Sequence, residues 1–141
     1  MAKSTQPPPL SAAQLEIMNV VWDGGEVTIT EVWQELCQQR KVARATVQTV
    51  IGRLEEKGWL RHRNVGQAFF YSAVHSRDAT QSRLVSNLVD SVFDGRVEGL
   101  VWALIKGRGV STEESARIQD MIDEASRKKA LRKKSQRSKI R

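Results

Sequence analysis

The stretch from Arg44 to Ser72 constrains the fold more than any other part of this chain. Its first half carries four branched aliphatic residues at i, i+3, i+4 and i+7, the spacing of one apolar helical face: Val47, Val50, Ile51 and Leu54. Lys57-Gly58 then reads as a helix stop, with a glycine just past a basic last turn. Two short segments rich in aromatic and branched residues follow, 59–63 and 68–72, around a glycine-containing turn. The pattern predicts a helix, a stop and a hairpin.

The face of this helix opposite the apolar stripe is small and polar. On a helical wheel it carries Ala45, Thr49 and Gly52, flanked by Thr46, Gln48 and Arg53. Between Arg40 and Arg63 the chain has seven basic residues against two acids, a net +5. A helix followed by a basic hairpin is the outline of a winged helix-turn-helix, whose helix enters a DNA major groove. The simpler alternative is a helix and a hairpin that only pack on each other, and the local positive charge favours DNA.

Residue chemistry divides the predicted DNA contacts into two groups. Glutamine suits adenine, arginine suits guanine, and threonine methyl groups suit thymine. The groove-facing residues are therefore predicted to be Thr46, Gln48, Thr49 and Arg53. Cations at the edges hold phosphates, which fixes the register without reading sequence. These are predicted to be Lys41, Arg44, Arg61 and Arg63.

The segments before this stretch complete a small domain. Capping-box signals begin at Ser11 and at Thr28 and predict two further helices. Residues 1–10 contain three consecutive prolines and no apolar periodicity, so we expect a flexible lead-in. The predicted winged-helix DNA-binding domain spans residues 11–74. The fold class is mainly α with a small β wing.

The second half, residues 75–126, is predicted to be helical throughout, with three short apolar stripes. About 50 residues make a marginal isolated core, so pooling the stripes with a second copy is the better solution. We therefore expect a helical dimerisation domain and a homodimer. The expected interface residues are Leu88, Val92, Leu100, Val101, Trp102, Leu104 and Ile122. The alternative is a monomeric appendage that packs on the winged helix.

The positive charge is concentrated at the C-terminus. The whole chain carries +7, and residues 127–141 hold nine Lys/Arg and no acid, so residues 1–126 carry −2. With almost no large apolar side chains, we expect this basic tail to be disordered when free. It is either a solubilising end or an arm that follows phosphates.

Several function classes are not expected. Cys37 is the only cysteine and there are two histidines, which is too few for a thiolate cluster or a zinc cage. A single cysteine also fits the reducing cytoplasm. No catalytic set, phosphate loop or membrane span is visible. We expect no enzyme activity, no cofactor, no metal and no membrane partner.

One pattern is more specific than these periodicities: T-V-Q-T-x-x-x-R-L-x-x-K-G over residues 46–58, followed by Gly66 and Tyr71. It resembles the penicillinase-repressor family of bacterial transcription factors, which includes the methicillin-resistance and copper-transport repressors. The resemblance covers roughly residues 10–126. It implies a homodimeric repressor on a pseudo-palindromic double-stranded DNA operator. The chain departs from the family at Ala45, where some members have lysine, and at Gln67, where arginine is frequent.

The resemblance also implies how DNA is released. Some members are cut by a receptor-linked protease at an Asn-Phe bond in the dimerisation half, and the matching pair here is Ala103-Leu104. Other members sense copper through a cysteine-rich C-terminal motif, which this tail lacks. An inducing protease is therefore kept as a candidate partner, and direct copper sensing is not expected.

Two other functions remain open from the residues alone. One is a sequence-tolerant architectural DNA-binding protein that uses the basic tail. The other is a winged-helix adaptor for protein partners. The polar face at Gln48, Thr49 and Arg53 favours a sequence-reading repressor over the adaptor.

Overall fold

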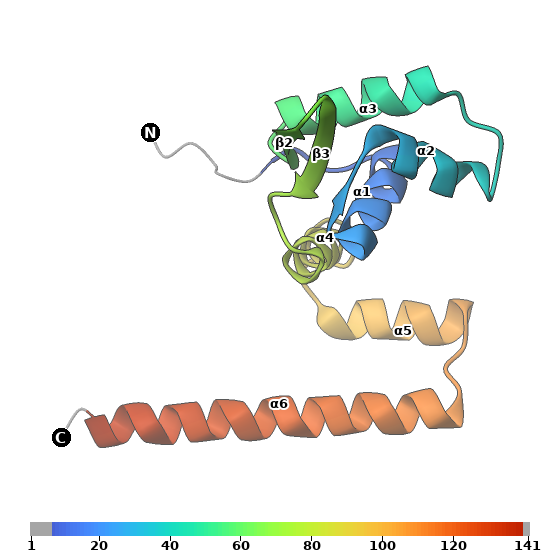
Figure 1. The fold of residues 1–141 in the computed structure, drawn as a ribbon. Helices are drawn as coiled ribbons and strands as arrows, with labels where there is room; N and C mark the ends of the chain where they lie inside the picture. The colour runs from blue at the N-terminus through green and yellow to red at the C-terminus, as the bar shows by residue number, and fades with distance from the viewer. Residues whose placement is uncertain (1–6, 140–141) are drawn as a thin grey trace. The chain divides into compact units, whose positions relative to one another are not determined.

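The structure is a computed structural model in which residues 7–139 are described, with side chains up to residue 138. Two compact units meet inside one helix: the first ends at Asn87 and the second begins at Leu88. The elements are α1 (Ala12–Gly24), β1 (Glu26–Val27), α2 (Ile29–Cys37), α3 (Arg44–Glu56), β2 (Leu60–Val65), β3 (Ala68–Ala73), α4 (Arg77–Val92), α5 (Val97–Gly107) and α6 (Thr112–Lys139). Figure 1 shows α1, α2 and α3 gathered beside the β2–β3 hairpin.

The first unit has one apolar core, built from the three helices and the sheet. Its buried members are Ile17, Met18, Val21, Val27, Val32, Leu36, Val47, Ile51, Leu54, Trp59, Leu60 and Tyr71. The predicted stripe of α3 faces this core, with Val50 half-buried at its margin. Each fully buried large side chain, such as Met18 or Ile51, contributes about 1.5–3 kcal/mol. The mainly α fold with a small β wing is therefore confirmed.

The helix starts follow the capping signals. Ser11 Oγ accepts a hydrogen bond from the Gln14 backbone at 3.2 Å, and the Gln14 side chain accepts one from the Ser11 backbone. Thr28 and Glu31 form the same reciprocal pair at the start of α2. These boxes satisfy backbone N–H groups that have no partner inside a helix. Both predicted helix starts are confirmed.

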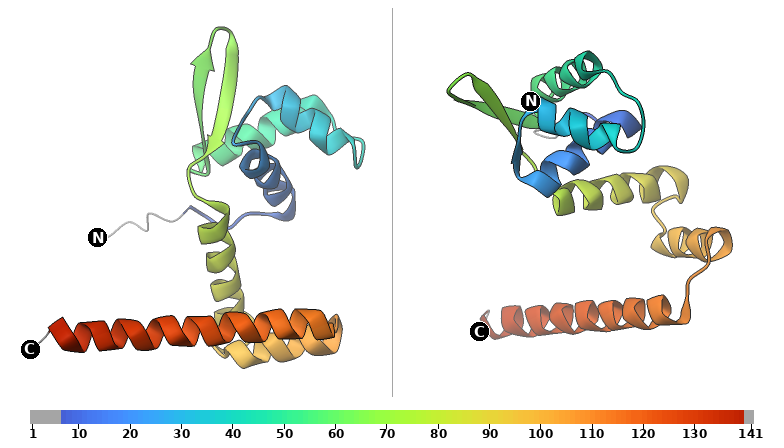
Figure 2. Two further views of the ribbon diagram at one scale, coloured as in Figure 1. Left: turned by 60° about the horizontal axis from the view of Figure 1, so that its bottom comes forward. Right: turned by 45° about the vertical axis from the view of Figure 1, so that its right-hand side comes forward.

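The sheet is antiparallel in the order β1-β3-β2. In the hairpin, Val65 lies opposite Ala68, which leaves a two-residue turn at Gly66-Gln67. Gly66 has φ 63°, a value that favours glycine, so the residue fits the turn. Figure 2 shows the hairpin standing out from the helices. Strand β1 is too short to predict from the sequence, and it pairs Glu26 with Ser72 at the base of the wing.

The first unit extends further along the chain than the sequence predicts. A boundary at residue 74 is expected, yet the start of α4 packs on α1. Trp22 Nε1 donates to the His75 carbonyl at 2.9 Å, and Arg77 reaches the Asp23 carboxylate at 2.7 Å. Thr80 is also buried. Because these long-range contacts hold the first half of α4, the unit ends at Asn87.

The N-terminal segment also differs from its prediction. The sequence indicates a flexible lead-in over residues 1–10, but residues 7–10 lie against the first unit. Trp59 Nε1 donates to the Pro8 carbonyl at 3.0 Å, and Leu10 packs on the core. Proline locks its own φ, so ordering this segment loses little backbone entropy. Residues 1–6 of the prediction lie outside the described residues.

The second unit consists of the end of α4, α5 and α6. Asp94 and Gly95 have φ values of 56° and 80° and separate α4 from α5. No residue of α5 is buried, and every described side chain of α6 is exposed. None of the described helices combines the length and the apolar character that a membrane crossing requires.

The basic tail does not have the predicted disorder over its described part. Helix α6 continues through residues 127–139. Lysine, arginine, glutamine, alanine and leucine are good helix formers, and residues added to an existing helix avoid the cost of nucleation. The composition of this segment predicts that it forms no apolar core, and the exposed side chains of α6 agree with that. The same composition is compatible with a solvent-exposed helix.

Candidate nucleic-acid interface

Helix α3 presents its polar face to solvent. Val47, Ile51 and Leu54 are buried, which fixes the rotation of the helix about its axis. On the other side, all four residues predicted to face a groove are exposed: Thr46, Gln48, Thr49 and Arg53. A helix with side chains is about 10–12 Å wide, close to the width of a major groove. The structure thus brings these four side chains onto one accessible surface, the α3 polar face.

Two of these side chains have no hydrogen-bond partner within the described chain, and a third makes one hydrogen bond. Among the described residues, Gln48 and Arg53 make no hydrogen bond or ion pair. Thr49 Oγ1 donates to the Ala45 carbonyl at 3.0 Å within the helix. Because this bond uses its hydroxyl proton, Thr49 offers a groove its methyl group and an acceptor lone pair. Gln48 and Arg53 keep their full donor capacity for a molecule outside the chain.

Only small side chains project from the centre of the α3 polar face. Ala45, Thr49 and Gly52 follow one another along the helix there. A Cβ added to Gly52 would meet no atom within 4 Å, and its φ is not positive. Neither internal packing nor backbone conformation therefore requires this glycine. A glycine in a helix interior costs about 0.5–1 kcal/mol relative to alanine, so close approach of an external molecule is the remaining structural reason.

The wing is anchored to α3 by one face of its hairpin. His62 Nδ1 contacts the Glu55 carboxylate, and the His62 ring stacks on Phe69 at 4.7 Å between ring centroids. Tyr71 is buried on the same face, which raises its pKa, and the nearby Glu55 carboxylate raises it further. The His62 side chain therefore joins the wing to α3.

The four predicted phosphate-binding cations fall into two groups. Lys41 and Arg61 are exposed and have no partner among the described residues. Arg44 donates to Thr30 Oγ1 at 3.1 Å. Arg63 donates to both carboxylate oxygens of Glu26 at 2.5 and 2.8 Å. The hydrogen bond from Arg63 holds the pKa of Glu26 below its ordinary value, and the Glu26 carboxylate raises the pKa of Arg63.

A hollow beside α3 contains residues that the sequence analysis does not single out as contacts. It lies between the start of α2, the start of α3 and the tip of the wing. Its lining residues are Thr28, Ile29, Thr30, Arg44, Gln67, Ala68 and Phe69. Thr30, which orients Arg44, is the residue missed. The only feature of the sequence that marks Thr30 is its position in the first turn of a helix that begins with a capping box. A polar residue at that position is also expected for a helix start, so it does not indicate a contact with Arg44.

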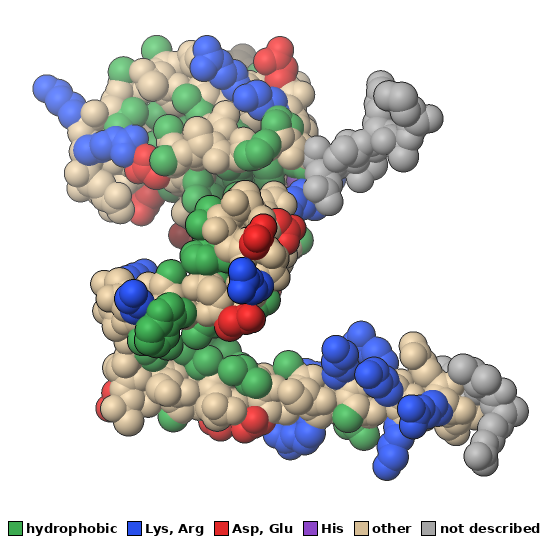
Figure 3. All heavy atoms as spheres, turned by 180° about the vertical axis from the view of Figure 1, so that it is seen from behind, with side chains coloured by type: hydrophobic (Ala, Val, Ile, Leu, Met, Phe, Trp, Pro, Cys, Tyr) green, Lys and Arg blue, Asp and Glu red, His purple; other side chains and the backbone are tan. Residues whose placement is uncertain are grey.

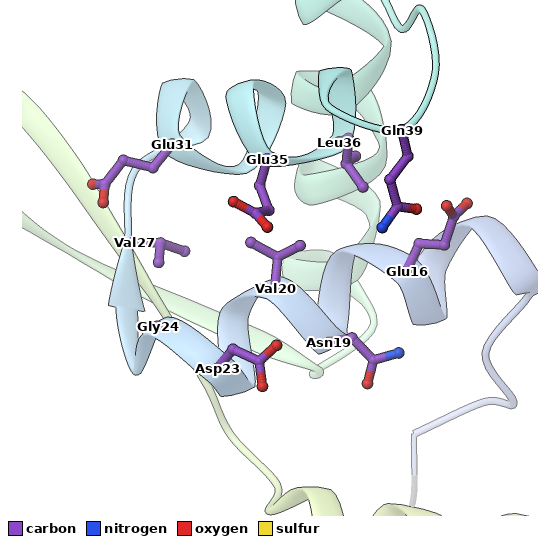
Figure 4. A pocket seen from close by; sticks show the side chains of 10 residues that line it. All are labelled: Glu16, Asn19, Val20, Asp23, Gly24, Val27, Glu31, Glu35, Leu36 and Gln39. Atoms are coloured by element: carbon purple, nitrogen blue, oxygen red, sulfur yellow. The ribbon is translucent and has the colours of Figure 1, made fainter.

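A second hollow, shown in Figure 4, is acidic and is lined by α1, α2 and neighbouring residues. Three of its four carboxylates are already engaged, and two of these pair with arginines: Glu16 with Arg40 at 2.7 Å, and Asp23 with Arg77. Glu31 completes the α2 capping box. No set of three His, Cys, Asp or Glu residues in the described chain lies close enough to hold a metal. Because the lining carries four carboxylates and no Lys or Arg, this hollow is unsuited to binding phosphate.

Three helices around one core, a β wing and an exposed polar third helix define a winged-helix protein. The chain belongs to the penicillinase repressor family, whose model matches residues 10–124. It is 28% identical over 123 residues to the penicillinase repressor of Bacillus licheniformis, covering 86% of this chain and 95% of that one. The identity is 23% over 119 residues with the Staphylococcus aureus penicillinase repressor, covering 84% and 94%.

Other similar proteins are regulators as well. The methicillin resistance regulatory protein MecI of Mammaliicoccus sciuri is 22% identical, covering 81% of this chain and 93% of that one. Among solved structures, the DNA-binding domain of the repressor BlaI is 32% identical, with a TM-score of 0.47, covering 52% of this chain and 90% of that one. Monomeric Bacillus licheniformis BlaI bound to the blaP half-operator is 33% identical, with a TM-score of 0.46, covering 52% and 89%.

Proposed function

We propose that this protein is a homodimeric transcriptional repressor that binds a pseudo-palindromic operator through α3. The observation that carries the proposal is the α3 polar face, where Gln48 and Arg53 are exposed and uncommitted on a helix whose other face is buried. Membership of a family named for repression supports the same reading. The action is expected in the cytoplasm, and the proposal assigns the chain no catalytic role and no cofactor.

The wing and the turn before α3 supply the phosphate contacts in this proposal. Lys41 and Arg61 are the cations with no competing partner in the described chain. Arg44 keeps further N–H groups free while it is held by Thr30, so it can contact phosphate from a fixed position. Arg63 would have to share its guanidinium with Glu26, so we rank it as the weakest of the four.

Dimerisation in this proposal uses the apolar surface of the second unit. Large apolar side chains there are exposed in the single chain, including Trp102 at 60% and Ile122 at 53%. The rest of the predicted interface, apart from the half-buried Leu100, is exposed as well: Leu88, Val92, Val101 and Leu104. Figure 3 shows hydrophobic side chains gathered on α5. An exposed apolar surface of this kind is characteristic of a protein interface, and a second copy offers the same surface.

The dimer also supplies affinity. One winged-helix unit has few phosphate contacts, and two units on adjacent half-sites add theirs. An inducing protease stays a candidate partner on the family resemblance, with Ala103-Leu104 as the corresponding bond on the exposed α5.

Alanine substitutions on α3 test the proposal. On a duplex selected by the wild-type protein from a random-sequence library, Arg53→Ala and Gln48→Ala should each cost about 1–3 kcal/mol of binding. Each should also relax the preference at one base position. Gln81→Ala, at an exposed helical glutamine away from α3, is the matched control and should change neither quantity. Full affinity and unchanged base preference in both α3 variants would remove α3 as the reader.

A further inference from the structure

The C-terminal part of α6 is a cationic helix. From residue 127 to residue 138 every side chain is exposed, and there is no acidic residue. Seven cations lie in this segment, which we call the basic arm: Arg127, Lys128, Lys129, Arg132, Lys133, Lys134 and Arg137. Figure 3 shows the blue side chains gathered along this half of the helix. The family match ends at residue 124, so it gives the arm no role.

The basic arm does not continue the apolar stripe of α6. Ile118, Met121, Ile122 and Ala125 lie on one side of the helix. The next two positions on that side are Lys129 and Arg132, so the stripe ends where the arm begins. A dimer interface along α6 therefore accounts for the first half of the helix and leaves the second half unexplained.

The arm is electrostatically unfavourable as it stands alone. Like charges lie four residues apart at three pairs of positions: Lys128 with Arg132, Lys129 with Lys133, and Lys133 with Arg137. Such pairs destabilise a helix. Lys128 forms an ion pair at 3.6 Å with Glu124, which precedes the arm. A polyanion beside the arm would relieve this repulsion.

We propose that the basic arm binds the phosphate backbone of duplex DNA beside the operator. This inference rests on the proposed function, since it assumes that the protein is on DNA. The cations surround the helix instead of forming one stripe, which suits phosphate contact without a fixed register. Within residues 127–138 there is no aromatic side chain to stack on single-stranded bases, and Leu131 is the only large apolar residue. The same residues therefore offer little to an unpaired nucleic acid or to a lipid bilayer.

The salt dependence of binding tests this inference. An arm-neutral variant replaces all seven cations with glutamine, a residue of similar helix propensity. Each phosphate neutralised adds about 0.9 to the slope of log affinity against log salt, and one side of a helix presents roughly half of the cations. On a random-sequence 40-bp duplex, the slope of the variant should be shallower by about three per subunit. A charge-preserving control, Arg127→Lys with Arg132→Lys and Arg137→Lys, should keep the wild-type slope.

The outcomes separate this inference from the proposed function. Equal slopes for the intact and arm-neutral proteins would overturn the arm's role on DNA. Loss of binding to single-stranded RNA or to anionic vesicles, with the duplex slope unchanged, would overturn it in favour of that other partner. If the arm-neutral slope falls but wild-type protein does not prefer its selected duplex over random sequence, the arm stands and the sequence-specific repressor fails.

Discussion

Nothing inside the described chain requires a glycine at position 52, whereas close approach of α3 to DNA would require one. Gly52 sits in the interior of α3, where a methyl group would touch nothing and the backbone is ordinary for a helix. Gly52→Ala should therefore raise the free energy of unfolding by about 0.5–1 kcal/mol. The same methyl group would stand between the helix and the groove floor, so operator affinity should fall. Denaturant unfolding and a fluorescence anisotropy titration measure the two effects.

The opposite signs of these effects identify the cause. Gly107→Ala is the matched control because Gly107 is also an exposed helical glycine where an added methyl group would meet open space, but it lies on α5. It should leave operator affinity unchanged. If Gly52→Ala stabilises the protein and binds the operator as tightly as the wild type, α3 does not approach DNA closely at this position.

The exposure of individual side chains can be predicted from the sequence, but their hydrogen-bond and ion-pair partners cannot. The exposure of Gln48 and Arg53 follows from helical periodicity, which the sequence displays directly. The pairing of Arg63 with Glu26 could not be foreseen, because it depends on β1 pairing with β3 across 46 positions of the chain, from Glu26 to Ser72. The contact between His62 and Glu55 could not be foreseen either, because the two residues belong to different elements.

At the scale of elements, the turn between α2 and α3 is held by a side chain. Trp33 Nε1 donates to the Val42 carbonyl at 2.8 Å, just before α3 begins without a side-chain cap. Trp33→Phe should lower the free energy of unfolding by about 0.5–1.5 kcal/mol, because the carbonyl loses that donor. Operator affinity should fall too, since this turn positions the start of α3.

Thermal and denaturant unfolding, together with operator titration, would check this prediction. Gln81→Ala is the control: Gln81 is exposed on α4 and belongs to neither the proposed DNA-binding surface nor the proposed dimer interface, so unfolding and operator affinity should barely change. An operator affinity that survives Trp33→Phe, despite a measured loss of stability, would mean that the turn does not set the position of α3.

The elements themselves are largely predictable, since local signals specify them. Capping boxes mark the starts of α1 and α2, and Gly58 and Gly66, both with positive φ, mark the end of α3 and the hairpin turn. Failures occur where non-local packing or helix continuation decides. The first half of α4 joins the first unit through contacts with α1, and α6 continues into a segment whose composition alone suggests disorder.

At the scale of the whole molecule, homodimerisation through the second unit can be tested with substitutions on α6. Ile122 and Ala116 are both exposed on α6, with Ile122 on the apolar stripe and Ala116 on the other side. Ile122→Glu should yield monomers in sedimentation velocity, because it places a charge inside the dimer interface. The variant should stay folded, since Ile122 is not buried in the single chain. Ala116→Glu adds the same charge and should remain a dimer, so monomers from both variants or from neither would contradict the assigned interface.

The most direct test of the central claim is the sequence that the protein selects. Wild-type protein, incubated with a library of random duplexes at one stated salt concentration, should enrich sites with two inverted half-sites. Their centres should lie about 10–10.5 bp, or a multiple of that distance, apart, because a two-fold dimer presents two copies of α3 to one face of the duplex. Enrichment of a single unrepeated site, or no enrichment over the starting library, would contradict a homodimeric repressor that reads DNA through α3.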